Sequence, residues 1–254
     1  MREPLLHLAE DGRATITLQR PLHHHRLHRE DLMALQAHLH ALAASPSARV
    51  LVITSSGPVF CSGFHLGELE EADAASADPQ LFEHTVDALE ALPLPTVARL
   101  NGSVYGGATD LALACDFRIG AIGMELRMPA ARLGLHYYAS GLQRYVSRLQ
   151  AAKRLFLLAQ AVTAEELLRI GYLDQLVPPA NLDAATDNVV HALLAVAPMA
   201  LQGMKLSLND TARGPDAQAA ARIAERVARC ASSDDMREGL AAWAARRAPR
   251  FTGR

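Results

Sequence analysis

The chain has 254 residues, half of them hydrophobic, and carries a formal net charge of −2 at pH 7. This length suits one large domain, or one domain with a small addition, and the hydrophobic share is enough for a large core. The near-neutral charge argues against the basic surface that a nucleic-acid-binding protein needs. Three cysteines (Cys61, Cys115 and Cys230) stand at wide, irregular spacing and give neither a disulfide framework nor a zinc motif.

The sequence shows no pattern typical of export or membrane insertion. Its first residues, MREPLLHLAEDGR, carry charges where a signal peptide has its apolar stretch. No run of about 18 apolar residues follows. We therefore expect a cytoplasmic protein, in a reducing compartment, that binds neither a membrane nor nucleic acid.

The first part of the chain alternates strand-like and helix-like patterns. Residues 14–21 (ATITLQRP) alternate as a strand does and end in a proline, and residues 29–44 place four leucines on one face of a helix. Residues 49–56 (RVLVITSS) contain the continuous apolar run VLVI, which is typical of a strand covered on both faces, and residues 95–102 (PTVARLNG) predict another strand. Strands that alternate with helices indicate an α/β core.

From about residue 140 the pattern turns helical. Residues 141–160 (GLQRYVSRLQAAKRLFLLAQ) predict one helix, and Thr163 with Glu166 forms a capping box that opens the next. The short segment YLDQLVP, residues 172–178, interrupts the helical pattern. Three further helical stretches follow, the last broken near Ser232–Ser233, at residues 180–197, 198–209 and 215–247.

Two glycine-containing turns each follow a predicted buried strand, at residues 57–69 (GPVFCSGFHLGEL) and 101–116 (NGSVYGGATDLALACD). Neither matches the phosphate-binding patterns G-x-x-x-x-G-K-[ST] or G-x-G-x-x-G. A strand, a glycine turn and a helix start together aim free backbone N–H groups at one point. Two such turns side by side would place two donors on one oxygen, which stabilises an oxyanion by about 2.7–4 kcal/mol per donor.

Five sequence pieces resemble, in order, the motifs of the crotonase (enoyl-CoA hydratase/isomerase) superfamily. Two are the glycine turns, and the others are ITLQRP, MPAARLGL with the later GLQR, and the terminal AWAARRAPRFTGR. The resemblance covers nearly the whole chain. It implies an α/β fold, the ClpP-like spiral of ββα units, over residues 1–195, and a C-terminal helical trimerisation region over residues 196–254. It also implies an acyl-CoA substrate, no separate cofactor, and assembly as a homotrimer or a dimer of trimers.

The resemblance further implies roles for single residues. The oxyanion-hole N–H groups of the family align with Ser62 and Gly107, which would hold a thioester carbonyl as it becomes an enolate. The first catalytic carboxylate of the family aligns with Asp110, although an aspartate in the first turn of a helix commonly only complements the helix dipole. The substrate channel would be lined by Ser62, Gly63, Phe64, His65, Gly106, Gly107 and Tyr137.

One departure from the family pattern bears on the reaction. Ala130 stands where the family has its second catalytic carboxylate, so the two-carboxylate arrangement that activates water is incomplete. General acid–base help is worth about 10²–10⁴-fold. We therefore expect double-bond isomerisation with Asp110 as the single acid/base. The alternatives are a hydratase in which His136, Tyr137 or water replaces the missing acid, and an inactive homologue that only binds acyl-CoA.

Other candidate groups are weaker. Residues 68–80 are acidic and predict a mobile surface loop, in which Glu68 is a minor candidate for a catalytic group. Ser62 with His65 suggests a serine hydrolase, but the G-x-S-x-G elbow is missing. No cysteine or carboxylate completes a metal site around the four histidines near the N-terminus, so we expect no metal. These histidines are His23, His24, His25 and His28.

Overall fold

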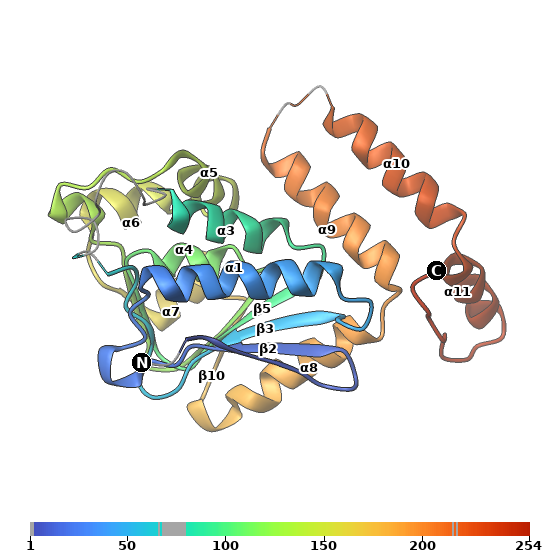
Figure 1. Cartoon of the computed structure of the whole chain (residues 1–254), viewed down its shortest axis with the longest axis horizontal. Helices are drawn as coiled ribbons and strands as arrows, with labels where there is room; N and C mark the ends of the chain where they lie inside the picture. Colours follow the sequence, from blue (N-terminus) through green and yellow to red (C-terminus); the bar gives the residue numbers. More distant parts are fainter. Residues whose placement is uncertain (1–2, 66, 68–79, 215, 217) are drawn as a thin grey trace.

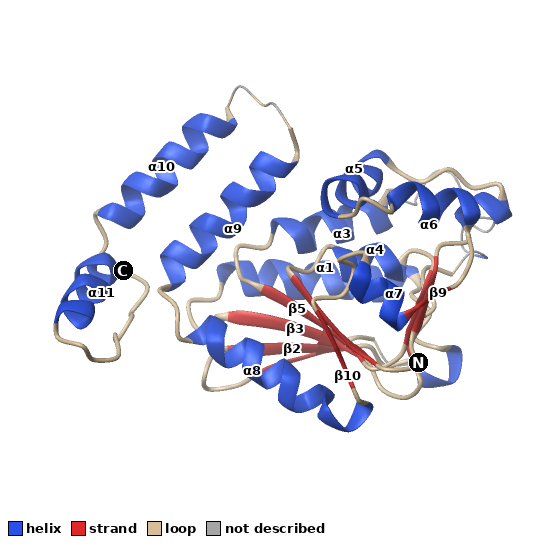
Figure 2. Cartoon of the chain, turned by 180° about the vertical axis from the view of Figure 1, so that it is seen from behind, coloured by secondary structure: helices blue, strands red, loops and turns tan. Residues whose placement is uncertain are grey.

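The structure is a computed structural model that describes residues 3–65, 67, 80–214, 216 and 218–254. Within these residues, a six-stranded sheet and a four-stranded sheet form the β-structure, and helices cover the larger sheet on both faces (Figures 1 and 2). The predicted α/β class is confirmed. The predicted loop at residues 68–80, with Glu68, falls outside the described residues except for Gln80.

The larger sheet is parallel apart from its first pair of strands, which is antiparallel. In spatial order its strands are β1 (Leu5–Leu8), β2 (Arg13–Thr17), β3 (Val50–Thr54), β5 (Thr96–Leu100), β7 (Phe117–Ala121) and β10 (Gln175–Val177). Side chains of β3 alternate between two hydrophobic clusters, one on each face of the sheet, which explains the continuous apolar run in the sequence.

The smaller sheet repeats one connection three times. Strands β3, β5 and β7 of the larger sheet are each followed by a short strand of the smaller one, and these short strands pair in parallel. They are β4 (Val59–Cys61), β6 (Ser103–Tyr105) and β8 (Glu125–Arg127), with β9 (Val162–Thr163) antiparallel at the edge. A strand, a second strand and then a helix make up the repeated unit, as the family resemblance implied.

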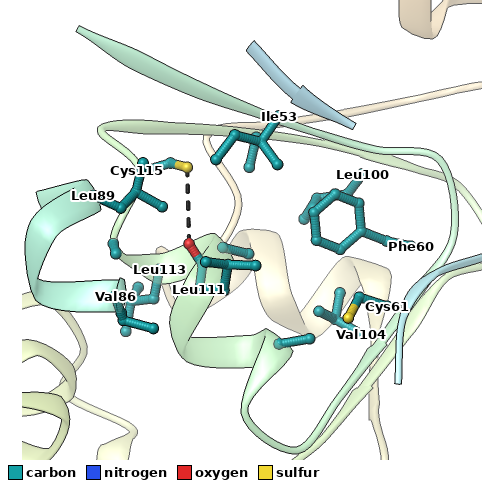
Figure 3. Close-up of a cluster of buried hydrophobic side chains, with 14 of the residues drawn as sticks. Ile53, Phe60, Cys61, Val86, Leu89, Leu100, Val104, Leu111, Leu113 and Cys115 are labelled. Atoms are coloured by element: carbon teal, nitrogen blue, oxygen red, sulfur yellow. Dashed lines mark hydrogen bonds between the residues drawn. The ribbon is translucent and has the colours of Figure 1, made fainter. Parts of the chain in front are cut away.

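Helices pack on both faces of the larger sheet (Figures 1 and 2). On one face lie α1 (Arg29–Ala44), α3 (Leu81–Ala91) and α4 (Ala108–Leu113), and on the other lies α8 (Leu182–Leu194). Figure 3 shows Leu111 and Leu113 of α4 in one buried cluster with Val86, Leu89 and Ile53. This packing fixes α4, and with it Asp110, against the sheet.

The three cysteines differ in burial. All three are free, and Cys61 and Cys115 are buried. Burial raises the pKa of each of these two thiols to about 12, so both are protonated core residues rather than nucleophiles.

The predicted helix at 141–160 is wrong in one respect, because the structure divides it into α5 (Ala139–Arg148) and α6 (Ala152–Leu158). Buried Leu149 takes an extended conformation and ends α5. Thr163 then caps α7 (Ala164–Arg169), where its side chain accepts a hydrogen bond from the Glu166 N–H, as predicted.

The C-terminal part is helical and extends away from the sheet (Figure 1). It comprises α9 (Pro198–Ala212), α10 (Ala219–Ala231) and α11 (Asp234–Ala244), and Ser233 caps α11 at the predicted break. Lys205 of α9 ties this part to the core, since its ammonium lies 2.8 Å from both the Leu94 carbonyl and Asp116. The domain boundary at residue 195 stays a prediction.

Among the described residues, no single helix is long and apolar enough to cross a membrane. The pair 179–194 and 198–212 has the length and composition only when its two helices are joined across a bend of 106°.

Candidate active site

A cavity of about 450 Å³ opens where the two glycine turns meet the first turn of α3 and the residues that follow β8. Its volume is typical of small-molecule sites. Its wall includes five of the predicted substrate or oxyanion residues, namely Ser62, Phe64, Gly106, Gly107 and Tyr137. Among the described residues, the other three predicted site residues do not line it: Gly63, His65 and Asp110.

The two glycine turns touch each other at Gly63, which lies at the base of the first turn. Its φ of +91° favours glycine, and a Cβ there would lie 2.8 Å from the Tyr105 carbonyl and 3.0 Å from the Gly107 nitrogen. In the second turn, Gly106 has a φ of +55° and leads into Gly107, the N-cap residue of α4. The close contact places the two turns side by side, and Phe64 of the first and Gly107 of the second both line the cavity.

The backbone N–H of Ser62, the predicted oxyanion donor, is not free, because it donates to the His24 carbonyl at 2.9 Å. Farther along the first turn, the Gly63 carbonyl accepts a hydrogen bond from the Leu27 N–H, and the His65 N–H donates to the Leu27 carbonyl. The Phe64 N–H, which lies between them, has no hydrogen-bond partner among the described residues. The same is true of the Gly107 N–H. The two free donors in adjacent turns are therefore those of Phe64 and Gly107.

Asp110 lies in the first turn of α4 with 0% of its surface exposed. Its Oδ2 accepts hydrogen bonds from the Arg144 guanidinium, at 2.8 Å, and from the Tyr138 hydroxyl. Its Oδ1 has no partner among the described residues. Burial raises the pKa of this carboxyl above its ordinary value, although Arg144 acts to lower it. Asp110 is thus more than a residue that complements a helix dipole.

Arg144 of α5 holds three carboxylates together. Its fully buried guanidinium lies 2.7 Å from Asp87, 2.8 Å from Asp110 and 3.3 Å from Glu90. Asp87 and Glu90 are on α3, so this cluster fastens α3, α4 and α5 to one another. The buried charge of Asp110 depends on that arrangement.

Tyr138 connects Asp110 to the cavity. Its hydroxyl donates to Asp110, whereas the residue itself lines the cavity wall. The Tyr137 ring stacks on it with 4.4 Å between ring centres, and the Tyr137 hydroxyl donates to the Tyr138 hydroxyl at 3.5 Å. Burial raises the pKa of both phenols, so both stay protonated and can donate. Tyr138 was not among the predicted catalytic or substrate-binding residues.

Three more residues of the wall bear on the chemistry. Ala130 lines the cavity at the predicted position and carries no titratable group. His136 is exposed, and its Nδ1–H donates to the Tyr137 carbonyl at 2.7 Å. Glu83, which sequence reasoning missed, accepts a hydrogen bond from the Ser140 hydroxyl at 3.1 Å. It belongs to none of the family motifs, so no pattern pointed to it.

The histidines considered as candidates in the sequence contact other groups of the protein. The His65 ring lies 4.7 Å from the His28 ring, centre to centre. His25 is buried and its Nε2 bonds to the Ser56 carbonyl. Within the part of the chain that the structure describes, no group of three or more histidine, cysteine or acidic side chains could hold a metal ion.

Comparison with the sequences of known proteins identifies the family. The family model for enoyl-CoA hydratase/isomerase matches residues 9–254. The chain belongs to this family, within the crotonase superfamily. It is 32% identical to an enoyl-CoA isomerase/hydratase of Mycosarcoma maydis over 82% of this chain and 78% of that protein. It is 28% identical to a 2,3-dehydroadipyl-CoA hydratase of Escherichia coli over 94% of both chains.

Solved structures of the enoyl-CoA hydratase/isomerase family confirm the fold. The crystal structure of an enoyl-CoA hydratase from Bacillus anthracis superimposes with a TM-score of 0.89 over all of both chains, at 25% identity. The chain is therefore an acyl-CoA enzyme of the hydratase/isomerase type. Because the relatives carry the names of both reactions, family membership leaves the choice between them open.

Proposed function

We propose that this enzyme binds an acyl-CoA thioester and stabilises its enolate through the N–H groups of Phe64 and Gly107. The observation that carries the proposal is the pair of unpartnered N–H groups, among the described residues, in two touching turns at the wall of one cavity. Two such donors on the thioester oxygen stabilise the negative charge that develops when an α proton leaves. The proposal needs no cofactor besides the coenzyme A of the substrate.

Proton transfer, in this proposal, runs through Tyr138 to Asp110. The α carbon of a 3-enoyl-CoA gives its proton to the Tyr138 oxygen while the Tyr138 proton moves to Asp110. The negative charge passes from the carboxylate to the dienolate oxygen. The reverse transfer at the γ carbon completes double-bond isomerisation. A raised pKa makes Asp110 a stronger base than an exposed aspartate, which supports this role.

We also propose that the enzyme assembles as a homotrimer or a dimer of trimers. Large apolar side chains on α10 and α11 support this, since they face solvent in the single chain. Trp243 is 81% exposed, Val227 63% and Leu240 58%. Exposed apolar side chains gathered on one part of a protein commonly mark an interface.

The test is a panel of saturated, 2-enoyl, 3-enoyl and dienoyl-CoA thioesters incubated with the enzyme in D₂O. NMR and mass spectrometry would locate the deuterium and identify the products. We expect exchange at the α carbon and conversion of the 3-enoyl thioester to the 2-enoyl thioester. Binding of acyl-CoA without exchange at either the α or the γ carbon would contradict the proposal and identify an inactive homologue.

A further inference from the structure

A second carboxylate, that of Glu83, opens on the cavity. Glu83 is half-buried in the first turn of α3 and is the only acidic residue in the cavity wall among the described residues. Its Oε1 accepts the Ser140 hydroxyl at 3.1 Å, and its Oε2 accepts no hydrogen bond from the described residues. Nor does Glu83 form an ion pair within that part of the chain. An oxygen of this carboxylate is free to bind water.

The first turn of α3 lies against the proposed oxyanion hole. A Cβ added to Gly107 would come within 2.6 Å of the Phe82 ring, the residue before Glu83. Phe82 also lies near Phe64, with 6.2 Å between ring centres. Phe82 therefore packs against Gly107 and near Phe64, so the first turn of α3, which carries Glu83, lies beside both turns that supply the proposed N–H donors.

Glu83 and Asp110 both lie near the first turn of α5, but they differ in their access to the cavity. Glu83 bonds to Ser140, and at the next residue, Gly141, an added Cβ would lie 2.8 Å from the Asp110 Oδ2. Asp110 is sealed from solvent and its Oδ2 is already bonded to Arg144 and Tyr138. Water in the cavity can reach Glu83 but not Asp110.

We propose that Glu83 is the general base that adds water to a 2-enoyl-CoA in this cavity. The inference rests on the proposed function for binding and for the oxyanion hole. Glu83 takes a proton from water as the water oxygen bonds to the β carbon, and the double-bond electrons move onto the thioester oxygen, held by Phe64 and Gly107. The α carbon then takes the proton back from Glu83. The product is a 3-hydroxyacyl-CoA, and the carboxylate is regenerated.

The other titratable groups of the wall suit this step less well. Tyr137 donates its hydroxyl to Tyr138 and Tyr138 donates to Asp110, so both hydroxyls belong to the relay that the proposed function uses for carbon-bound protons. His136 is exposed and its Nδ1–H is bonded to backbone, which places it at the rim. Glu83 combines access to the cavity with an oxygen that has no partner among the described residues.

The test compares hydration of a short 2-enoyl-CoA by wild type, Glu83→Ala and Glu83→Gln, after thermal melts confirm that each variant folds. We expect turnover at saturating substrate to slow by about 100-fold or more in both variants, with KM little changed, as for loss of general acid–base help. Formate should restore part of the rate to Glu83→Ala, because its carboxylate fits the space vacated. Glu225→Gln, which removes an exposed carboxylate of α10, is the matched control.

The role of Glu83 would be overturned by no hydration by wild type, by unchanged turnover in the variants, or by a defect confined to KM. Failure of formate to restore any rate would overturn it as well. Exchange of the α protons of a saturated acyl-CoA in D₂O separates this inference from the function on which it rests. If wild type exchanges those protons but Glu83 proves dispensable, only the inference fails. If wild type exchanges none, the proposed function fails as well.

Discussion

The two carboxylates near the first turn of α5 are held in opposite ways. Asp110 is sealed in the core by Arg144 and Tyr138, whereas Glu83 lies in the cavity wall with one hydrogen bond, from Ser140. The buried carboxylate depends on its partners for stability, and in the proposed mechanism it acts on substrate through Tyr138. The open carboxylate depends on few contacts and can meet water directly. In the mechanism proposed above, burial divides the two groups between transfer of carbon-bound protons and activation of water.

The largest expected effect is on stability, from removing the guanidinium that Asp110 needs. Arg144→Met should lower the free energy of unfolding by about 3–5 kcal/mol, because it leaves buried carboxylates without their cation. Denaturant unfolding measures this. Arg154→Met is the control, since Arg154 is exposed and its pair with Glu166 should contribute at most about 1 kcal/mol. Equal losses in the two variants would show that Asp110 does not depend on Arg144.

A second variant removes the Gly107 N–H, a donor of the oxyanion hole that both proposed reactions use. In a Phe82→Leu background, which makes room for a Cβ at residue 107, Gly107→Pro deletes the N–H and Gly107→Ala retains it. The φ of −58° at Gly107 suits proline. Relative to alanine, proline should slow both isomerisation and hydration by about 10²–10³-fold, the effect of losing one donor. If only one of the two reactions slows, they do not share an oxyanion hole.

The pH dependence of stability should reveal the buried carboxylate. Folding raises the pKa of Asp110 above its ordinary value of 3.8, so the folded state holds this proton more tightly than the unfolded state. The stabilisation of the folded state by this tighter proton binding is therefore complete below pH 3.8 and is lost as the pH rises through the folded pKa. The stability of wild type relative to Asp110→Asn should fall over that interval. A difference that rises with pH would mean that Arg144 outweighs burial.

The smallest expected effect concerns the open carboxylate. Glu83→Gln should change the free energy of unfolding by no more than about 0.5 kcal/mol, because Glu83 is half-buried and glutamine can still accept the Ser140 hydroxyl. Denaturant unfolding beside wild type measures the change. A loss of several kcal/mol would show that Glu83 supports the fold and would weaken its assignment to catalysis.

The sequence predicted the parts of the fold that local patterns determine. The predictions for the leucines of α1, the apolar run of β3, the cap at Thr163 and the break near Ser232–Ser233 all depend on neighbouring residues, and all are confirmed. The break after α5 was missed because it depends on the packing of Leu149 rather than on a helix-breaking residue.

The candidate site was predicted less completely, because distant contacts decide it. Ser62 matches the family motif, but its N–H donates to the His24 carbonyl, far back in the chain, whereas the Phe64 N–H has no partner among the described residues. Asp110 was found from its motif, whereas its dependence on Arg144 was not, since 34 residues separate the two. Glu83 stands in no motif and enters the site only because α3 packs there.

The central claim is that Asp110 exchanges protons with an acyl-CoA enolate through Tyr138. It is tested most directly by the rate of deuterium incorporation at the α carbon of a saturated acyl-CoA in D₂O, followed by NMR for wild type, Asp110→Asn and Tyr138→Phe. Both variants should lose about 10²–10⁴-fold in rate while coenzyme A affinity stays close to that of wild type. Exchange at the wild-type rate in Asp110→Asn would contradict the account and leave Asp110 as a structural partner of Arg144.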